Sequence, residues 1–156
     1  AADRLIPDIL MSFELDKAVI VRNPNATRPW QHVLEPLSGY LLLIQKLFDN
    51  SEEYSEGWNF GPNEKDVKPV HWIIDKMISY WPNATWELDK NSNPHEAHFL
   101  KLNISKASEK LGWKPTWDLQ MTLENIIRWH KLWLDGADMR KVCIAEINNF
   151  TIDMNK

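Results

Sequence analysis

Cysteine and glycine are both scarce in this sequence. Cys143 is the one cysteine among 156 residues, so no disulfide can form within the chain, and such cysteine usage is typical of a reducing, cytoplasmic compartment. The five glycines stand apart from one another, which excludes a glycine-rich loop that cradles a phosphate. The longest aliphatic run, "GYLLLIQKLF", is shorter than the roughly 20 residues of a membrane-spanning helix, so no membrane association is expected.

The charge balance is mildly acidic. Acidic residues outnumber basic ones by 22 to 18, which gives a net charge of −4 and an isoelectric point near 5.7. This balance argues against a broad surface for nucleic acid or anionic membranes, although it leaves room for one local cationic pocket. With 44% apolar residues, the chain is expected to bury an ordinary globular core. Its nine tryptophans are interpreted mainly as packing residues.

Hydrophobic periodicity predicts a mixed α/β chain in which helices dominate. A helix C-cap is expected at Gly112 and an N-cap at Asp118. Pro29 restricts the second predicted strand to an edge or an irregular extension. Short strands such as 57–61 cannot form a stable sheet alone and are expected to belong to a larger one. The predicted helices are 3–16, from 34 onward, 67–81, 105–111, 118–135 and, more weakly, 137–156; the predicted strands are 17–22, 28–33, 57–62, 84–89 and 97–102.

The arginines are unevenly distributed. Arg4, Arg22 and Arg28 are three of the five in the chain, and each is expected at the end of an element or beside a turn. A guanidinium makes bidentate, permanently charged contacts with phosphate, so a diphosphate ligand would use such positions. Surface solvation, or ion pairing with nearby carboxylates, is the simpler alternative on composition alone.

Other candidate groups are less specific. "PHEAH" places His95 and His98 around Glu96, but the spacing is not that of a helical metal-binding pair, and extended backbone would point the two imidazoles to opposite faces. A loop histidine that hydrogen-bonds a ligand or a backbone group is the preferred interpretation. No tyrosine is followed by a lysine four residues later, and no Ser-His-Asp or Cys-His set can be assembled. The residues alone therefore indicate an anion site without catalytic machinery.

Several segments resemble a known family. "DRLIPDIL", "VIVRNPNATRPWQHVLEPLSGYLLL", "EGWNFGP", "PHEAHFLKLNISKASEKLGWKPTW" and "WLDGADMRKVC" are similar, in order, to the C-terminal half of the CDP-glucose 4,6-dehydratases. These are extended short-chain dehydrogenases/reductases, and the resemblance covers nearly the whole chain. "RPWQHVLEP" and "HEAHFLKL" distinguish this family from its dTDP- and GDP-sugar relatives, whereas "LGWKP" is more widely shared.

The resemblance implies an α/β fold. Residues 1–156 would form the C-terminal substrate-binding lobe, with a few strands and helices that complete a Rossmann domain. The glycine-rich NAD loop and the Tyr-x-x-x-Lys pair would precede the first residue. The enzyme implied is a cytoplasmic, homo-oligomeric, NAD-dependent lyase that dehydrates CDP-D-glucose to CDP-4-dehydro-6-deoxy-D-glucose. Such a product would enter deoxysugar biosynthesis, for example for lipopolysaccharide O-antigen, and this chain alone is expected to be inactive.

The resemblance also implies roles for individual residues. Arg28 is the first candidate for the pyrophosphate and Arg4 the second, while Arg22 would contact a phosphate or the cytosine. His95 would close the pocket from a distant loop, with Glu96 orienting it. Trp30 and His32 would fix the strand that presents Arg28. Two alternatives stay open: a stand-alone nucleotide-sugar-binding module, or an interaction protein that uses its tryptophans and C-terminal helices.

Overall fold

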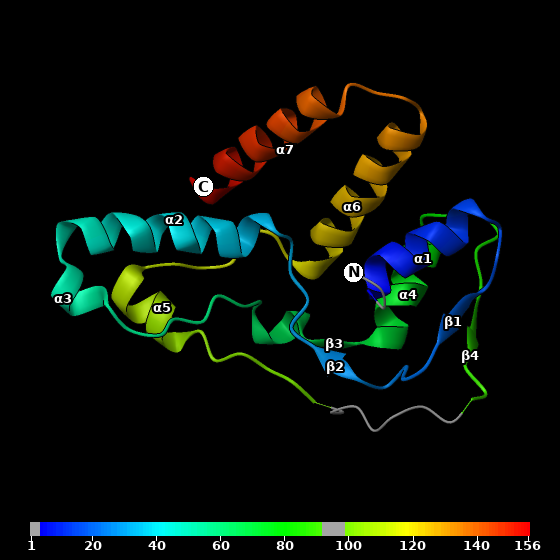
Figure 1. The fold of residues 1–156 in the computed structure, drawn as a ribbon, viewed down its shortest axis with the longest axis horizontal. Coiled ribbons are helices and arrows are strands. Elements are labelled where there is room, and N and C mark those ends of the chain that lie inside the picture. The colour runs from blue at the N-terminus through cyan, green and yellow to red at the C-terminus, as the bar shows by residue number, and fades with distance from the viewer. Residues whose placement is uncertain (1–3, 92–98) are drawn as a thin grey trace.

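The computed structural model describes residues 4–91 and 99–156, and within them helices dominate two small sheets (Figure 1). None of these helices combines the length and apolarity needed to cross a membrane. The helices are α1 (Leu5–Glu14), α2 (Leu34–Asp49), α3 (Ser51–Tyr54), α4 (Val70–Ile78), α5 (Ser105–Leu111), α6 (Leu119–Leu134) and α7 (Met139–Met154), with a 3-10 turn at Glu64–Asp66; the strands are β1 (Val19–Val21), β2 (Thr27–Arg28), β3 (Lys68–Pro69) and β4 (Trp86–Leu88).

Each sheet has two strands. β1 pairs with β4 in parallel, with Val19 opposite Trp86, and β2 pairs with β3 in antiparallel fashion, with Arg28 opposite Lys68. Strand pairs this small are marginal in water and depend on the helices packed against them. α1 and α4 supply that support, because α1 lies against β1 and α4 continues directly from β3.

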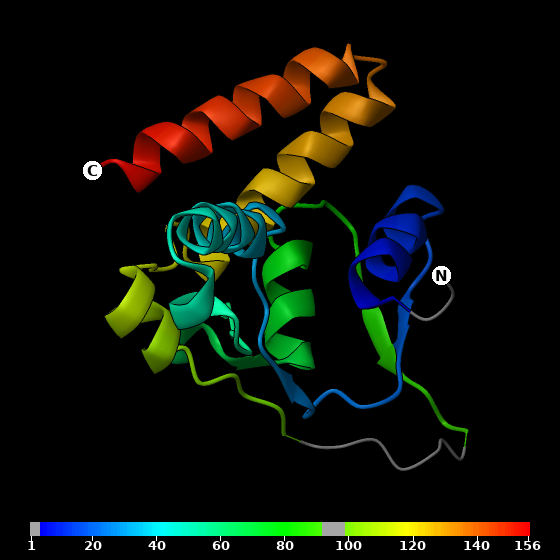
Figure 2. The ribbon, with the colours of Figure 1, turned by 60° about the vertical axis from the view of Figure 1, so that its left-hand side comes forward.

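The main core lies between α1, β1, α4 and α6. Its fully buried side chains include Ile9, Ile73, Ile74 and Met77, which recur at helical spacing and so form one apolar stripe on each helix. A second, smaller cluster joins α2 to α5 around Phe60, Ala107, Leu111 and Trp113. Figure 2 shows α6 and α7 extending above the rest of the molecule and α2, seen nearly end-on, close to α5.

The predicted helix boundaries are largely confirmed. Gly112 ends α5 at φ +69°, in the left-handed conformation that glycine adopts without strain. The Asp118 carboxylate accepts a hydrogen bond from the Met121 N–H at 2.9 Å and so caps α6. The tail forms a complete helix, α7, rather than a weak one, because Asp138 caps its first turn by accepting from the Lys141 N–H.

Two strand predictions are wrong. Residues 57–62 form no strand, because no other strand of the described part of the chain lies alongside them. The strand expected at 28–33 is limited to Thr27–Arg28, since Pro29 has no N–H with which to continue the ladder. The restriction expected at Pro29 is thus confirmed.

Candidate functional site

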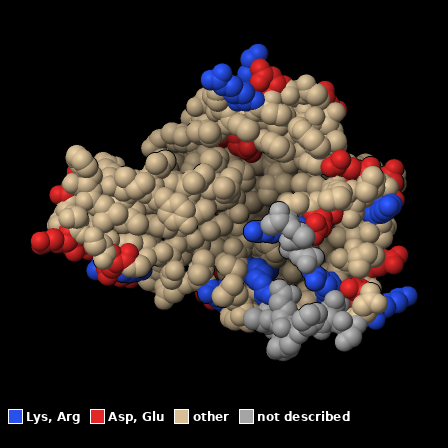
Figure 3. Space-filling model, viewed as in Figure 1, with Lys and Arg blue, Asp and Glu red and all other residues tan. Residues whose placement is uncertain are grey.

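A cavity of about 160 Å³ opens beside the end of β1. Its walls come from the first turn of α1, from β1 and the turn that follows it, from β2 and from the start of α4. The charged side chains that line it are Asp8, Arg22 and Arg28, and its apolar wall includes Val21 and Trp30. Figure 3 shows Lys and Arg side chains gathered in this part of the molecule, at the lower right of the view.

Backbone hydrogen bonds bring Arg22 and Arg28 to the same cavity. Arg22 follows the last residue of β1, and the turn after it closes with a bond from the Ala26 N–H to the Asn23 carbonyl at 3.2 Å. The start of α4 then holds this turn, because the Val70 N–H donates to the Ala26 carbonyl at 3.0 Å. The chain therefore reverses within a few residues, and both arginines line one cavity.

Trp30 fixes the strand that carries Arg28. Its indole N–H donates to the Lys68 carbonyl at 2.9 Å, and its ring is half-buried against the main core. The Arg28 guanidinium itself donates to the Thr27 carbonyl at 3.0 Å. On the other edge of β2, Phe99 forms a bridge with Thr27, the residue before Arg28.

The remaining predicted site residues lie elsewhere. Arg4 is exposed at the N-terminus of α1 and does not line the cavity, although its neighbour Leu5 does. His95 and the rest of "PHEAH" fall outside the described residues. Among the residues that are described, no group of His, Cys, Asp and Glu side chains could hold a metal ion.

Sequence reasoning missed Asp8 and Lys68. Asp8 brings a carboxylate to the cavity from α1, which favours a ligand with hydrogen-bond donors as well as phosphate oxygens. Lys68 lies directly opposite Arg28 in the β2–β3 pair, and directly opposite residues share one face of an antiparallel pair. Lys68 therefore adds a third positive charge next to this strand. Asp8 joins the cavity because α1 packs on β1, and Lys68 lies near Arg28 because β3 pairs with β2. Neither contact can be read from the local sequence.

The second half of "RPWQHVLEP" holds the start of α2 in place. Glu35 is fully buried, and its two carboxylate oxygens accept hydrogen bonds from the N–H groups of Thr116 at 2.9 Å and Trp117 at 2.7 Å. Burial raises the pKa of Glu35, and these two bonds partly oppose the shift. A single carboxylate thus joins the start of α2 to the loop before α6.

His32 is buried beside this junction. Its Nδ1 accepts a hydrogen bond from the Leu34 N–H at 3.3 Å, which leaves the proton of the neutral ring on Nε2. Nε2 lies 3.8 Å from the Glu146 Oε1, and the edge of the ring meets Trp117 at 5.0 Å between centroids. Burial lowers the pKa of His32 to about 4. The expected packing role of His32 agrees with these contacts.

The chain does not fit NAD by itself. Gly39 and Gly61 pack tightly against side chains, and Gly112 and Gly136 have the positive φ angles found at helix C-termini. No glycine-rich turn therefore opens onto a helix N-terminus, where a dinucleotide pyrophosphate would bind. The cavity lining contains two arginines, which can bind an anion, and it contains no nucleophile next to a base.

The comparisons with known proteins agree with the motif resemblance. No protein-family profile matches the chain. The chain is 54% identical over 151 residues to CDP-glucose 4,6-dehydratase of Salmonella typhimurium, a match that covers 96% of this chain and 42% of that protein. Its fold is similar to that of UDP-N-acetylglucosamine 4-epimerase from Bacillus cereus, with a TM-score of 0.63 at 16% identity, over 84% of this chain and 44% of that one.

These findings confirm two predictions. The resemblance to a CDP-glucose 4,6-dehydratase is confirmed by sequence identity. The α/β fold is confirmed by its similarity to part of the fold of the Bacillus cereus epimerase. The chain spans less than half the length of each of these two proteins.

Proposed function

We propose that this chain is the substrate-binding part of a CDP-glucose 4,6-dehydratase. The observation that carries the proposal is the 54% identity to such an enzyme over 96% of the chain. The proposed reaction removes one water molecule from CDP-D-glucose and leaves CDP-4-dehydro-6-deoxy-D-glucose. NAD, bound by the part of the enzyme that this chain does not match, would serve the internal oxidation and reduction of the sugar.

Arg22 and Arg28 are proposed to hold the diphosphate. Both line one cavity, and two guanidinium groups supply enough donors to bind several phosphate oxygens at once. Asp8, which also lines the cavity, would accept a hydrogen bond from a neutral donor of the ligand, such as a ribose hydroxyl or the cytosine amino group. This arrangement favours a ligand that carries neutral hydrogen-bond donors as well as phosphate oxygens, as a nucleotide diphosphate does.

Arg4 and His95 are proposed as outer contacts of the same ligand. Arg4 lies one residue before Leu5 of the cavity wall, so a ligand larger than the cavity would reach it. Phe99, four residues after His95 in the sequence, pairs with Thr27, the residue before Arg28. We place the enzyme in the cytoplasm, as a homo-oligomer whose subunits would meet through helices of the part not matched here.

Binding energy at the diphosphate would serve catalysis indirectly. The nucleotide does not react, but holding it fixes the sugar relative to the reacting groups, and this lowers the entropic part of the barrier. The chain's own residues would therefore orient the substrate, while proton and hydride transfer belong to the other part of the enzyme.

The test uses a chimera in which this chain replaces the matching 42% of the Salmonella typhimurium enzyme. Isothermal calorimetry should show CDP-glucose binding more tightly than the UDP and GDP sugars. Arg28→Ala should weaken that binding by about tenfold to a hundredfold, since a hydrogen bond to a charged group contributes about 1.5–3 kcal/mol. Arg140→Ala, which removes the same charge from the exposed surface of α7, is the matched control.

Several outcomes would refute the proposal. A chimera that binds no nucleotide sugar would point to the interaction-protein alternative. Equal affinities for the chimera and its Arg28→Ala variant would remove Arg28 from the site. Binding of CDP-glucose without any turnover, in a chimera whose parent enzyme is active, would favour the stand-alone binding module.

A further inference from the structure

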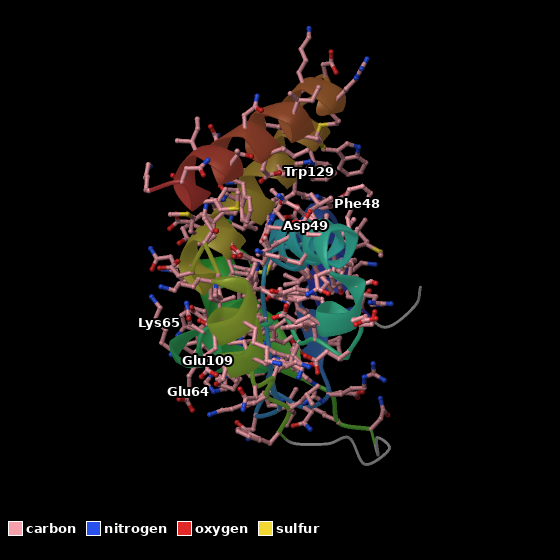
Figure 4. All side chains as sticks on the ribbon, turned by 90° about the vertical axis from the view of Figure 1, so that its left-hand side faces the viewer. Phe48, Asp49, Glu64, Lys65, Glu109 and Trp129 are labelled. Atoms are coloured by element: carbon pink, nitrogen blue, oxygen red, sulfur yellow. The ribbon has the colours of Figure 1, made fainter. Side chains whose placement is uncertain are left out.

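A second cavity, of about 400 Å³, opens between α1, the start of α2, α6 and α7. It shares no lining residue with the cavity that contains the two arginines. Most of its wall is apolar: Leu10, Val33, Leu34, Ile126, Trp129 and Ile147. His32, Cys143 and Glu146 complete the lining. Figure 4 shows Trp129 beside the ribbons of α6 and α7. An apolar cavity with a few polar groups at one place is typical of a small-molecule site.

Glu146 brings an unsatisfied acceptor to this cavity. Its side chain is only 10% exposed, and its Oε1 accepts no hydrogen bond from the described part of the chain. Two nitrogens, Nε2 of His32 and Nη2 of Arg128, each lie 3.8 Å from this oxygen, which is too far for a hydrogen bond. A buried acceptor without a partner costs free energy. A donor from a bound molecule would remove this cost.

His32 places a donor next to that acceptor. Its Nδ1 already accepts a hydrogen bond from the Leu34 N–H, so the neutral ring carries its proton on Nε2. Burial lowers the pKa of His32 to about 4, and the ring is therefore uncharged at pH 7. The gap of 3.8 Å separates one donor from one acceptor. A hydroxyl oxygen can lie about 2.8 Å from both atoms, where it accepts from Nε2 and donates to Oε1.

Other chemical groups satisfy this pair of atoms less well. A methyl group would leave both unpaired. An ammonium would donate to Glu146 but has no lone pair for the His32 N–H, and a carboxylate would meet the carboxylate of Glu146 without a proton to share. One water molecule could make both bonds, but its share of volume is about 30 Å³, so most of the apolar wall would remain without contacts.

We propose that this cavity binds a small alcohol or phenol. Its hydroxyl would lie between His32 and Glu146, and its apolar body would lie along the wall formed by Ile126, Trp129 and the other apolar residues. The inference does not rest on the proposed function, because the two cavities are separate and this one would take an uncharged molecule.

Three probes of the same shape test the hydroxyl. Benzyl alcohol, ethylbenzene and benzylammonium differ in one terminal group, and each can be titrated into the chain while amide and indole signals are followed by NMR. The Leu34 N–H and the Trp129 indole N–H report on the site, because they bind His32 and Cys143. Both signals should shift to saturation with benzyl alcohol. Benzylammonium should bind about tenfold or more weakly, since it leaves the His32 N–H unpaired; tighter binding of benzylammonium would overturn the choice of ligand.

Glu146→Leu removes the acceptor and keeps a side chain of similar size. Because ethylbenzene is the more hydrophobic probe, the quantity to compare is the affinity of benzyl alcohol relative to that of ethylbenzene. This ratio should fall about tenfold to a hundredfold in Glu146→Leu, through loss of a hydrogen bond to a charged group. Glu146→Gln keeps a carbonyl acceptor and should retain most of the ratio. An unchanged ratio in Glu146→Leu would refute the inference.

A blocking variant tests the position of the site without changing a buried residue. Cys143 is exposed on α7 and lines the cavity, so Cys143→Phe should fill the cavity and abolish binding of benzyl alcohol. Ile152→Phe, on the same helix, is the matched control, because Ile152 is 59% exposed and lies outside this lining. Equal affinities of the two variants for benzyl alcohol would remove the cavity as the binding site. Shifts that never saturate in the natural chain would indicate non-specific partitioning and would also refute it.

The same titration on the chimera separates this inference from the proposed function. Saturable binding of benzyl alcohol is expected there too. A chimera that binds CDP-glucose but not benzyl alcohol would show that the rest of the enzyme covers the cavity, which refutes this inference alone. A chimera that binds benzyl alcohol but no nucleotide sugar would refute the proposed function alone.

Discussion

Lowering the pH from 7 to 5 should reduce the free energy of unfolding through His32. The side chain is 92% buried, and burial lowers its pKa from 6.5 to about 4. In the unfolded chain the imidazole has its ordinary pKa and takes up a proton first, so the contribution of His32 to stability is complete above pH 6.5 and is lost as the pH falls. At 1.36 kcal/mol per pH unit, the loss is about 2 kcal/mol at pH 5 and about 3 kcal/mol at pH 4.

The groups around His32 make a variant necessary. Glu146 faces it at 3.8 Å and in turn lies 3.8 Å from Arg128. Burial raises the pKa of Glu146 and of Glu35. A raised carboxyl pKa has the opposite sign, because the native state then binds the proton more tightly and gains stability as the pH falls. The total pH dependence is therefore a sum, and the part due to His32 must be obtained by difference.

His32→Asn isolates that part. Asparagine keeps an acceptor near the position of Nδ1 for the Leu34 N–H and does not titrate. The variant should be less stable at pH 7 because ring packing is lost, and the gap between it and the natural chain should shrink by about 2 kcal/mol at pH 5. Urea unfolding followed by circular dichroism measures both. An equal gap at pH 7 and pH 5 would refute the reasoning, while an equal gap at pH 7 and pH 8 is the internal control.

Three further predictions concern contacts made by α2 and by the segment before it, and each is measured by urea unfolding at pH 7. Glu35→Ala should cost about 2–4 kcal/mol, because one buried and one partly buried N–H group lose their acceptor; a cost below about 1 kcal/mol would show that these two bonds do not hold α2 to the loop before α6. Gly39→Val should cost about 2 kcal/mol or more, since its side chain overlaps Phe60, whereas Gly57→Val, with open space around it, should cost less. Trp30→Phe should cost about 1 kcal/mol for the lost bond to the β3 carbonyl, and a stability equal to that of the natural chain would show that the bond contributes nothing.

The helices were the predictable part of the fold, because their signals are local. α4 shows its apolar spacing within nine residues, and Gly112 and Asp118 mark helix ends by their own conformation and hydrogen bonds. Strands depend on partners elsewhere in the chain. The pattern at 57–62 predicted a strand from its apolar residues, but none formed because no neighbouring strand of the described residues is available to pair with it.

The candidate site was predictable in part for the same reason. Arg22 and Arg28 were recognised by their position at element ends, and the structure brings both to one cavity. Arg4 met the same criterion and lies outside the cavity lining, because the first residue before a helix can face solvent. Asp8 reaches the cavity through the packing of α1 on β1, and Glu35 binds N–H groups 81 and 82 residues away. No local sequence pattern shows that residues so far apart in the chain will be in contact.

The stretch from Arg28 to Glu35 links the cavity to residues 57–62 and to α2. Trp30 binds β3, Gln31 binds the Phe60 carbonyl of segment 57–62, and Glu35 secures α2. Movement of segment 57–62 would therefore pull on the strand that carries Arg28, three residues away from Gln31. Because the distance from a guanidinium nitrogen to a phosphate oxygen can vary by only a few tenths of an ångström in a good hydrogen bond, the position of residues 57–62 is expected to affect the diphosphate contact proposed for Arg28.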